Sequence, residues 1–428
     1  MVKRFTMDSN SNNSAPELKT SLISNTGEVL FALFLSAAYL KADTRLAFVQ
    51  THIDITLLFF GLSFLAFIYR VIENNYHPRV SRDFICVAFL FFLLGACLAA
   101  GLLQTQSPQY GYVKALRFIS VTGWAFLGGV LLITDVQSLK RFSMALAIIA
   151  LAMAIDALLG YQSALLLDIE PAAFGSDHIA LGRACGLGLL TIIAFLLPTE
   201  RELWLRFGLW IVASLQLLTT FISQAMGPIS SLVLSFLFFF AISVRGWPRI
   251  RIDRFALRLF VVTLFATIII VLVLLQGIFP SLTYDMQNYL TGGDRNVVER
   301  LSYYQTAYRQ FSENPIWGIG TGEFKLVTED YAYDYPHNII LELAAETGLL
   351  SVLVFITMIG IIFGRGLFYL YASNGLDRIV SRYLLAACCF TLLNAMVSYD
   401  INGNMILFTF VGLLTALTRF QMPGAKEA

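Results

Sequence analysis

One histidine stands where an imidazole could take a proton from a substrate. His337 follows Tyr335-Pro336 and precedes an apolar stretch with helical periodicity, so we expect it near the N-terminus of a helix. An imidazole is the side chain that binds or releases a proton near neutral pH. The helix dipole would lower its pKa and keep it neutral, which suits a general base. The alternative is a histidine that only caps the helix or lies at the membrane interface.

Arg183 is a cation inside an apolar, glycine-rich stretch, flanked by Gly182 and Gly186. An arginine at membrane depth costs at least a few kcal/mol unless its charge is paired or hydrated, so it is a functional candidate. Its guanidinium is a planar fork of donors that matches phosphate oxygens. The alternatives are a side chain that reaches the interface, or a structural ion pair with Asp177 or Asp156.

Further charged or proton-binding residues could support these two. Arg300 lies on a helix that we expect in a loop, where the alternative is a solvated helix face with Glu299 or Asp294 nearby. Arg309 on the same expected helix is a weaker candidate. His178, at the start of the glycine-rich stretch, is the second histidine worth testing.

The composition indicates that the solvent of this chain is mostly lipid. Of 428 residues, 57% are hydrophobic and 13% are charged, whereas soluble proteins are about one quarter charged. These values exclude an ordinary cytosolic enzyme and a disordered chain, and the net charge of +1 argues against a nucleic-acid partner. The sequence has no P-loop motif and no metal-ligand spacing, and its five cysteines lie in apolar runs, so we expect no cofactor and no metal.

Twelve apolar stretches are long enough to cross a bilayer, which needs about 20 residues each. The expected fold is an all-α polytopic membrane protein. Residues 1–20 form a polar tail without the apolar core of a signal peptide, and nine transmembrane helices follow within 21–276. A large loop at 277–347 separates them from three more helices and a short tail within 348–428. The expected spans are 21–40, 53–72, 83–103, 112–134, 141–160, 178–198, 203–222, 226–244, 256–276, 348–371, 379–398 and 403–419.

The distribution of lysine and arginine predicts the orientation. With both termini in the cytoplasm, 20 of the 29 basic residues lie on the cytoplasmic side, as the positive-inside rule requires. The loop at 277–347 is then on the outer side. The same is true of Arg183 and Arg300.

The loop at 277–347 is too rich in aromatic residues to be disordered. Segment 296–313 has helical periodicity and stops at Asn314-Pro315, and a second helix begins near His337 and continues into the next span. A glycine-rich turn at 318–322 lies between them. The first helix is expected to carry one apolar stripe of Val297, Leu301, Tyr304, Tyr308 and Phe311.

Three stretches of the second half form a recognisable pattern. They are Arg300–Ala307 (RLSYYQTA), Asn314–Phe324 (NPIWGIGTGEF), and His337-Asn338 followed by nine residues and Gly348. Together with twelve spans and one large outer loop, they resemble the O-antigen ligase and O-antigen polymerase superfamily of bacterial envelopes. The ligases close the histidine motif with Gly, Thr or Tyr three positions after the glycine, where this chain has Ser351.

Weaker features point to the same superfamily. Arg183–Leu187 fits the Arg-x-x-x-Leu of the ligases, and Arg309 and Gly320 have the ten-residue separation of an arginine–glycine pattern in the polymerases. Many relatives have Ser-Arg-Gly at an outer connection where this chain has Gln224.

The resemblance implies a GT-C-like, metal-independent, inverting glycosyltransferase of the bacterial inner membrane with a periplasmic active site. It would move a glycan from undecaprenyl diphosphate to a sugar hydroxyl of lipid A–core oligosaccharide, in lipopolysaccharide biosynthesis. Its partners would be that donor, that acceptor and membrane lipids. His337 would be the catalytic base and Arg183 and Arg300 would bind the diphosphate. The possible supporting residues are Arg309, His178, Asn338 and Gly320.

Other functions remain open at this point. A polymerase would use the same donor with another carrier-linked glycan as acceptor, and a protein O-oligosaccharyltransferase belongs to the same superfamily. A transporter also commonly has twelve spans, but we find no inverted repeat in the sequence.

Overall fold

The computed structural model describes residues 22–41, 43–74, 81–106, 108–166, 169–245, 251–252, 295–324 and 334–420. These ranges are helical apart from a two-stranded antiparallel ribbon of β1 (Val244–Arg245) and β2 (Arg251–Ile252). The helices and short helical turns (η) are α1 (Leu22–Ser36), η1 (Ala37–Leu40), η2 (Thr44–Leu46), α2 (Ala47–Gln50), α3 (Ile55–Asn74), α4 (Arg82–Gly101), α5 (Pro108–Arg117), η3 (Phe118–Thr122), α6 (Gly123–Leu132), α7 (Val136–Leu166), α8 (His178–Thr191), η4 (Ile192–Leu196), α9 (Leu197–Thr199), α10 (Leu203–Ile222), α11 (Met226–Ala241), α14 (Arg295–Glu313), α16 (Ile339–Ala372), α17 (Gly375–Ala395), α18 (Met405–Thr415) and η5 (Leu417–Arg419).

The chain is a multi-pass membrane protein. Within the described ranges, seven helical segments are long and apolar enough to cross a bilayer. They are Ile55–Glu73, Arg82–Gly101, Gln109–Leu132, Val136–Ala164, His178–Thr199, Leu203–Ile222 and Ile339–Ala372.

The remaining expected spans divide into three kinds. Those at 21–40, 226–244 and 403–419 coincide with shorter apolar helices. The one at 379–398 coincides with α17, which is long enough but carries charged residues. The span at 256–276 lies outside the described residues, so the number twelve stays a prediction.

α17 lies in the interior of the bundle, in contact with α8, α11, α16 and α18. Its Arg382 is buried, donates from Nη1 to Ser243 Oγ at 3.1 Å and lies 4.8 Å from the centroid of the Phe239 ring. The structure surrounds Arg382 with protein, which is how a charged helix can lie in the interior of a membrane bundle.

An ion-pair cluster explains how α1 tolerates an acidic residue in its apolar stretch. Glu28 is fully buried, and its Oε1 accepts from Arg70 Nη2 at 3.0 Å and from Arg141 Nη2 at 2.9 Å. The carboxylate is therefore compensated by two cations from α3 and α7.

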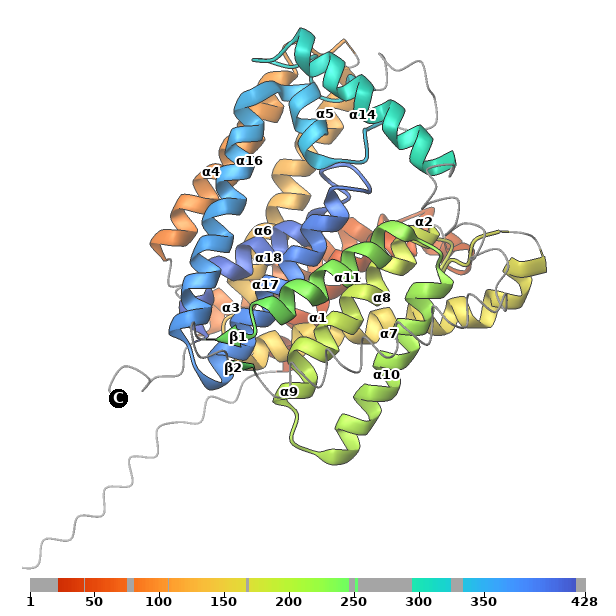
Figure 1. Ribbon diagram of the computed structural model, residues 1–428, viewed down its shortest axis with the longest axis vertical. Helices are drawn as coiled ribbons and strands as arrows, with labels where there is room; N and C mark the ends of the chain where they lie inside the picture. The colour runs from red at the N-terminus through yellow and green to blue at the C-terminus, as the bar shows by residue number, and fades with distance from the viewer. Residues whose placement is uncertain are drawn as a thin grey trace, which may run out of the picture.

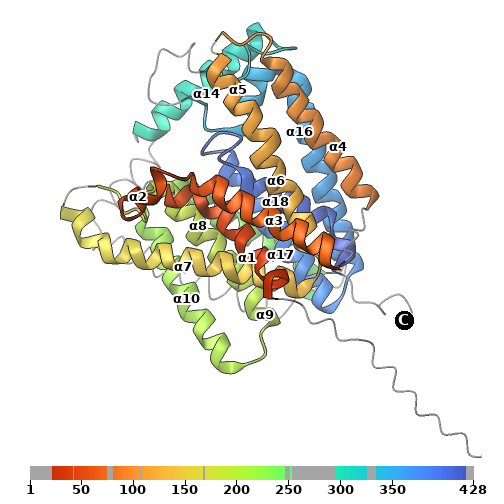
Figure 2. The ribbon, with the colours of Figure 1, turned by 180° about the vertical axis from the view of Figure 1, so that it is seen from behind.

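α14 confirms the helix expected at 296–313, which ends before Asn314-Pro315. The expected apolar stripe is not the packed face of the helix, since its Leu301 and Tyr308 are 52% and 66% exposed. The face that packs against α16 is instead made by Tyr303, Ala307 and Gln310, all buried. Figures 1 and 2 show α14 lying across the ends of α4, α5 and α16, at one end of the molecule.

The start of α16 is fixed by the glycine-rich turn that follows α14. Ile319 N donates to Ala345 O at 2.9 Å, Gly320 N to Glu346 O at 3.0 Å, and Leu349 N to Pro315 O at 2.8 Å. At Gly348 the helix is interrupted, with φ 76° and ψ −169°, a conformation that suits glycine. A Cβ atom on Gly348 would overlap the Ile316 carbonyl, so the two segments touch backbone to backbone.

Candidate active site

His337 occupies the residue just before the N-cap of α16. Asn338 caps the helix by accepting from Ile340 N at 3.0 Å and Leu341 N at 3.1 Å, and its Nδ2 donates to Met396 O at 3.1 Å. His337 itself has φ 56°, which costs a non-glycine residue about 1–3 kcal/mol. Only 5% of it is exposed. The surrounding contacts therefore hold the imidazole in one unusual position.

The surroundings of His337 keep its imidazole neutral. The ring lies 4.8 Å from that of Tyr335 and 6.3 Å from that of Tyr303, measured between centroids. Burial lowers the pKa of His337 to about 4, the nearby Arg300 guanidinium lowers it further, and Asp177 opposes the shift. The expected neutral histidine is thus present, but burial rather than the helix dipole is the main cause.

Arg300 projects from α14 and is half-buried. Arg300 forms no hydrogen bond or ion pair in the described part of the chain. The solvated ion pair with Glu299, considered as an alternative role, is therefore not seen. The other residue considered, Asp294, lies outside the described residues. The charge of Arg300 acts on His337. The guanidinium is consequently available for an anion.

Arg183 lies in the second turn of α8 and is only 6% exposed. Its Nη2 donates to Asn404 Oδ1 at 2.7 Å, and the guanidinium lies 4.7 Å from the centroid of the Tyr399 ring. Nη1 has no hydrogen-bond partner among the described residues. A buried guanidinium with an unused donor and no carboxylate beside it is an incomplete ion pair.

Neither carboxylate considered as a partner of Arg183 pairs with it. Asp156 accepts from Arg45 Nη1 at 2.7 Å and from Phe174 N at 2.8 Å. Asp177 accepts instead from the hydroxyl of Tyr399. The structural ion pair that we considered as an alternative for Arg183 is therefore absent among the described residues.

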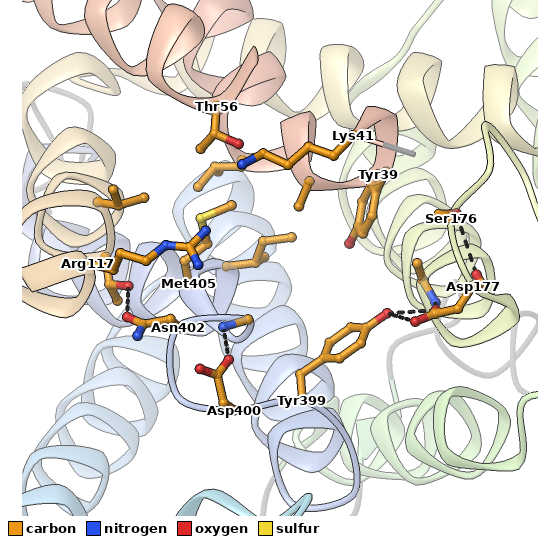
Figure 3. A pocket seen from close by; sticks show the side chains of 17 residues that line it. Tyr39, Lys41, Thr56, Arg117, Ser176, Asp177, Tyr399, Asp400, Asn402 and Met405 are labelled. Carbon is orange, nitrogen blue, oxygen red and sulfur yellow. Dashed lines mark hydrogen bonds between the residues drawn. The ribbon is translucent and has the colours of Figure 1, made fainter. Parts of the chain in front are cut away.

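Tyr399 connects Arg183 to Asp177. Its hydroxyl donates to Asp177 Oδ1 at 2.7 Å and Oδ2 at 2.9 Å (Figure 3), while its ring faces Arg183. Burial and the adjacent Asp177 raise the pKa of Tyr399, so the phenol stays a donor. Asp177 and Arg300 both act electrostatically on His337, and we refer to Arg183, Tyr399, Asp177, Arg300 and His337 together as the cluster.

A buried ion-pair triad of Lys114, Glu342 and Glu346 holds together the segments around the cluster. Lys114 Nζ lies 2.7 Å from Glu342 Oε1 and 2.7 Å from both carboxylate oxygens of Glu346, and all three side chains are buried. Ile401 N, in the loop that carries Tyr399, donates to Glu342 Oε1 at 3.2 Å. The triad thus fixes α5, the start of α16 and that loop relative to one another.

The middle of the chain is similar to one known protein family. Residues 207–356 match the family model described as O-antigen ligase. This stretch, about a third of the chain, is similar to that family. A comparison with curated proteins finds no match. The family supports an enzyme of the O-antigen ligase or polymerase type.

The matched residues include two members of the cluster, Arg300 and His337, whereas Arg183 precedes them. Among the supporting residues predicted from the sequence, Asn338 is brought to the cluster. Within the described chain, no three His, Cys, Asp or Glu side chains gather in a way that could hold a metal ion.

The other supporting residues make contacts outside the cluster. His178 Nδ1 is 2.9 Å from Glu170 Oε2, and this bond lowers the pKa of Glu170. Arg309 is exposed on α14, nine residues and so about two and a half turns beyond Arg300, on the opposite side of the helix. Gly320 forms part of the turn that contacts α16. Gln224 lies half-buried in the turn between α10 and α11, with φ 57°.

Two residues that contact Arg183, Tyr399 and Asn404, were not predicted from the sequence. A signal for them exists, since the polar run 399–404 (YDINGN) interrupts two expected spans. Ser351, the unusual closing residue of the histidine motif, is buried and donates to Gly348 O at 2.9 Å. It therefore stabilises the interruption of α16 in place of the usual residue.

Proposed function

We propose that this chain is an O-antigen ligase that transfers a glycan from undecaprenyl diphosphate to a sugar hydroxyl of lipid A–core oligosaccharide. The reaction takes place at the periplasmic face of the bacterial inner membrane. The observation that carries the proposal is the cluster of one neutral imidazole and two guanidinium groups that lack carboxylate partners among the described residues.

The transfer is a single displacement. Arg183 and Arg300 bind the diphosphate oxygens and stabilise the negative charge that grows on them as the bond to the anomeric carbon breaks. The acceptor oxygen forms the new bond to that carbon from the opposite side, which inverts it. The proton of the acceptor hydroxyl passes to the imidazole of His337, and general-base assistance of this kind contributes about 10²–10⁴-fold.

Donor binding prepares the base. With a pKa of about 4, the His337 imidazole is neutral but weakly basic in the free protein. A diphosphate placed against Arg300 opposes the field of that cation, and nearby negative charge raises the pKa of an imidazole. His337 therefore becomes a stronger base only when the donor is present.

The test is a reconstituted assay with purified carrier-linked glycan and lipid A–core, with and without a chelator. We expect His337→Ala to abolish transfer while the protein stays folded and inserted, because the proposed general base is removed. His52→Ala is the matched control, since His52 is exposed and its ring contacts Phe48 and Thr51. Near-normal transfer by His337→Ala would remove the general-base assignment.

The same assay separates ligase from polymerase. A ligase extends lipid A–core, whereas a polymerase extends a second carrier-linked glycan and leaves lipid A–core unchanged. Arg309 and Gly320 fit a polymerase spacing, but the structure places Arg309 on the far side of α14 from Arg300. The position of Arg309 therefore gives no support to a polymerase function.

A further inference from the structure

A cavity of about 320 Å³ lies directly beside the cluster. It is bounded by the end of α1 and η1, the start of α3, the junction of α5 and η3, the start of α8, and the loop before α18 (Figure 3). Asp177 and Tyr399 belong both to its wall and to the cluster around His337. Such a volume lies within the range of small-ligand pockets.

One end of the cavity is cationic. Figure 3 shows Lys41 and Arg117 reaching toward it from η1 and α5. Lys41 Nζ is 2.7 Å from Asp54 Oδ2, so its charge is partly compensated. Arg117 is exposed and forms no hydrogen bond or ion pair in the described part of the chain. This end can therefore accept an anion without breaking an existing pair of Arg117.

The other end offers hydrogen-bonding groups and aromatic rings. Tyr39, Ser176, Asp177 and Tyr399 line it, and the Tyr399 hydroxyl points at the Asp177 carboxylate. Carboxylates accept hydrogen bonds from hydroxyl groups, and tyrosine combines an apolar ring with a polar tip. The two ends together suit one sugar ring that carries both hydroxyls and a negatively charged substituent.

We propose that this cavity binds an anionic sugar of the acceptor, with its phosphate or carboxylate at Arg117 and Lys41 and its hydroxyls at Asp177 and Tyr399. The inference rests on the proposed ligase function and names the acceptor class. Tyr399 relates the two sites: its ring faces Arg183, the proposed diphosphate residue, and it lines the cavity together with Asp177, to which its hydroxyl donates.

A binding experiment tests the site without any transfer. Isothermal titration of the detergent-solubilised full chain with glucose 6-phosphate, glucose and inorganic phosphate is compared for wild type, Arg117→Gln and Arg201→Gln. Arg201 is an exposed arginine between α9 and α10, far from the cavity wall in sequence and absent from its lining, so it is the matched control. Of the three ligands, we expect glucose 6-phosphate to bind wild type most tightly. Its affinity should fall at least about tenfold in Arg117→Gln and stay unchanged in Arg201→Gln, because only the first change removes a charge-assisted hydrogen bond. Equal binding of inorganic phosphate, or no effect of Arg117→Gln, would overturn the proposal.

A transfer experiment then assigns the cavity to acceptor or donor. Two acceptors are used, lipid A–core with its core phosphates and the same molecule after their removal. We expect Arg117→Gln to raise KM for the phosphorylated acceptor about tenfold, with kcat, donor KM and the KM for the dephosphorylated acceptor nearly unchanged. A raised donor KM, or equal effects on both acceptors, contradicts the assignment. If wild type transfers glycan to neither acceptor, the proposed ligase function is contradicted. The titration remains a separate test of whether the cavity binds an anionic sugar.

Discussion

The imidazole of His337 must be neutral to take a proton, and its protein surroundings bias it strongly in that direction. Burial and Arg300 hold its pKa near 4 in the free protein, well below the usual value. The neutral fraction therefore rises as the pH increases through about 4 and is nearly complete at neutral pH. Bound diphosphate acts against Arg300, so the corresponding pKa in the donor complex is higher.

The first prediction concerns this pH dependence. Because kcat/KM reports the free enzyme and kcat the bound complex, the acidic limb of kcat/KM for the donor should lie near pH 4 and that of kcat at higher pH. Arg300→Gln should move the free-enzyme limb upward, since a pKa-lowering charge is removed. Initial rates from about pH 4 to 8 measure both limbs. Superimposable limbs would contradict donor-induced activation of the base.

The second prediction concerns the shape of the cation at position 183. The guanidinium of Arg183 contacts the Tyr399 ring and Asn404 at once and keeps a further donor free. Lysine supplies a point charge that cannot reproduce this planar arrangement. Arg183→Lys should reduce kcat/KM at least about 100-fold, as expected for loss of charge-assisted contacts to the diphosphate. Arg206→Lys is the control, and full activity of Arg183→Lys would leave Arg183 a structural residue.

At the scale of elements, the interruption of α16 at Gly348 determines where His337 is placed. The turn after α14 approaches the α16 backbone so closely that a methyl group at Gly348 would overlap the Ile316 carbonyl. The same turn hydrogen-bonds to Ala345 and Glu346 in the first turns of α16. α14, which carries Arg300, is thereby linked to the helix that begins just after His337.

The third prediction tests this contact. Gly348→Ala should destabilise the protein by about 1–3 kcal/mol, because alanine is strained at φ 76° and clashes with the turn. Gly360→Ala on the same helix is the matched control, since nothing lies within 4 Å of an added Cβ there. That change should be neutral or stabilise the helix by up to about 1 kcal/mol. Thermal unfolding in detergent measures both, and equal midpoints would show that the close contact is unimportant.

Much of the element structure was predictable from local signals. The extent of α14 follows from its periodicity and from Asn314-Pro315, and the start of α16 follows from Pro336. The buried face of α14 was not predictable in the same way. Large residues such as Leu301 and Tyr308 are exposed there, and the packed face uses Ala307 and Gln310, so hydrophobicity alone points to the wrong side.

The candidate site was likewise only partly predictable from the sequence. His337, Arg183 and Arg300 are conspicuous in sequence because each is unusual in its local context. Tyr399, Asn404 and the Lys114 triad matter through contacts between segments more than 200 residues apart. Only the folded chain brings these partners together, so no spacing rule within one segment could find them.

At the scale of the whole molecule, the orientation in the membrane is the fourth prediction. Ser312 is exposed on α14, and Asn374 is exposed in the turn between α16 and α17, beyond the other end of α16 from His337. In a chain whose five cysteines are replaced, Ser312→Cys should react with a membrane-impermeant maleimide in intact spheroplasts. Asn374→Cys should react only after permeabilisation. The reverse pattern would place the cluster in the cytoplasm and contradict the positive-inside assignment.

The buried triad has a consequence for biosynthesis. Lys114 precedes Glu346 by 232 residues, so the ribosome has still to make more than half of the chain when α5 is ready to enter the bilayer. Until α16 arrives, α5 carries an ammonium without its counterions. Stable insertion of the early helices must therefore wait for the late ones, and a truncated nascent chain that ends before α16 should be a substrate for membrane quality-control proteases.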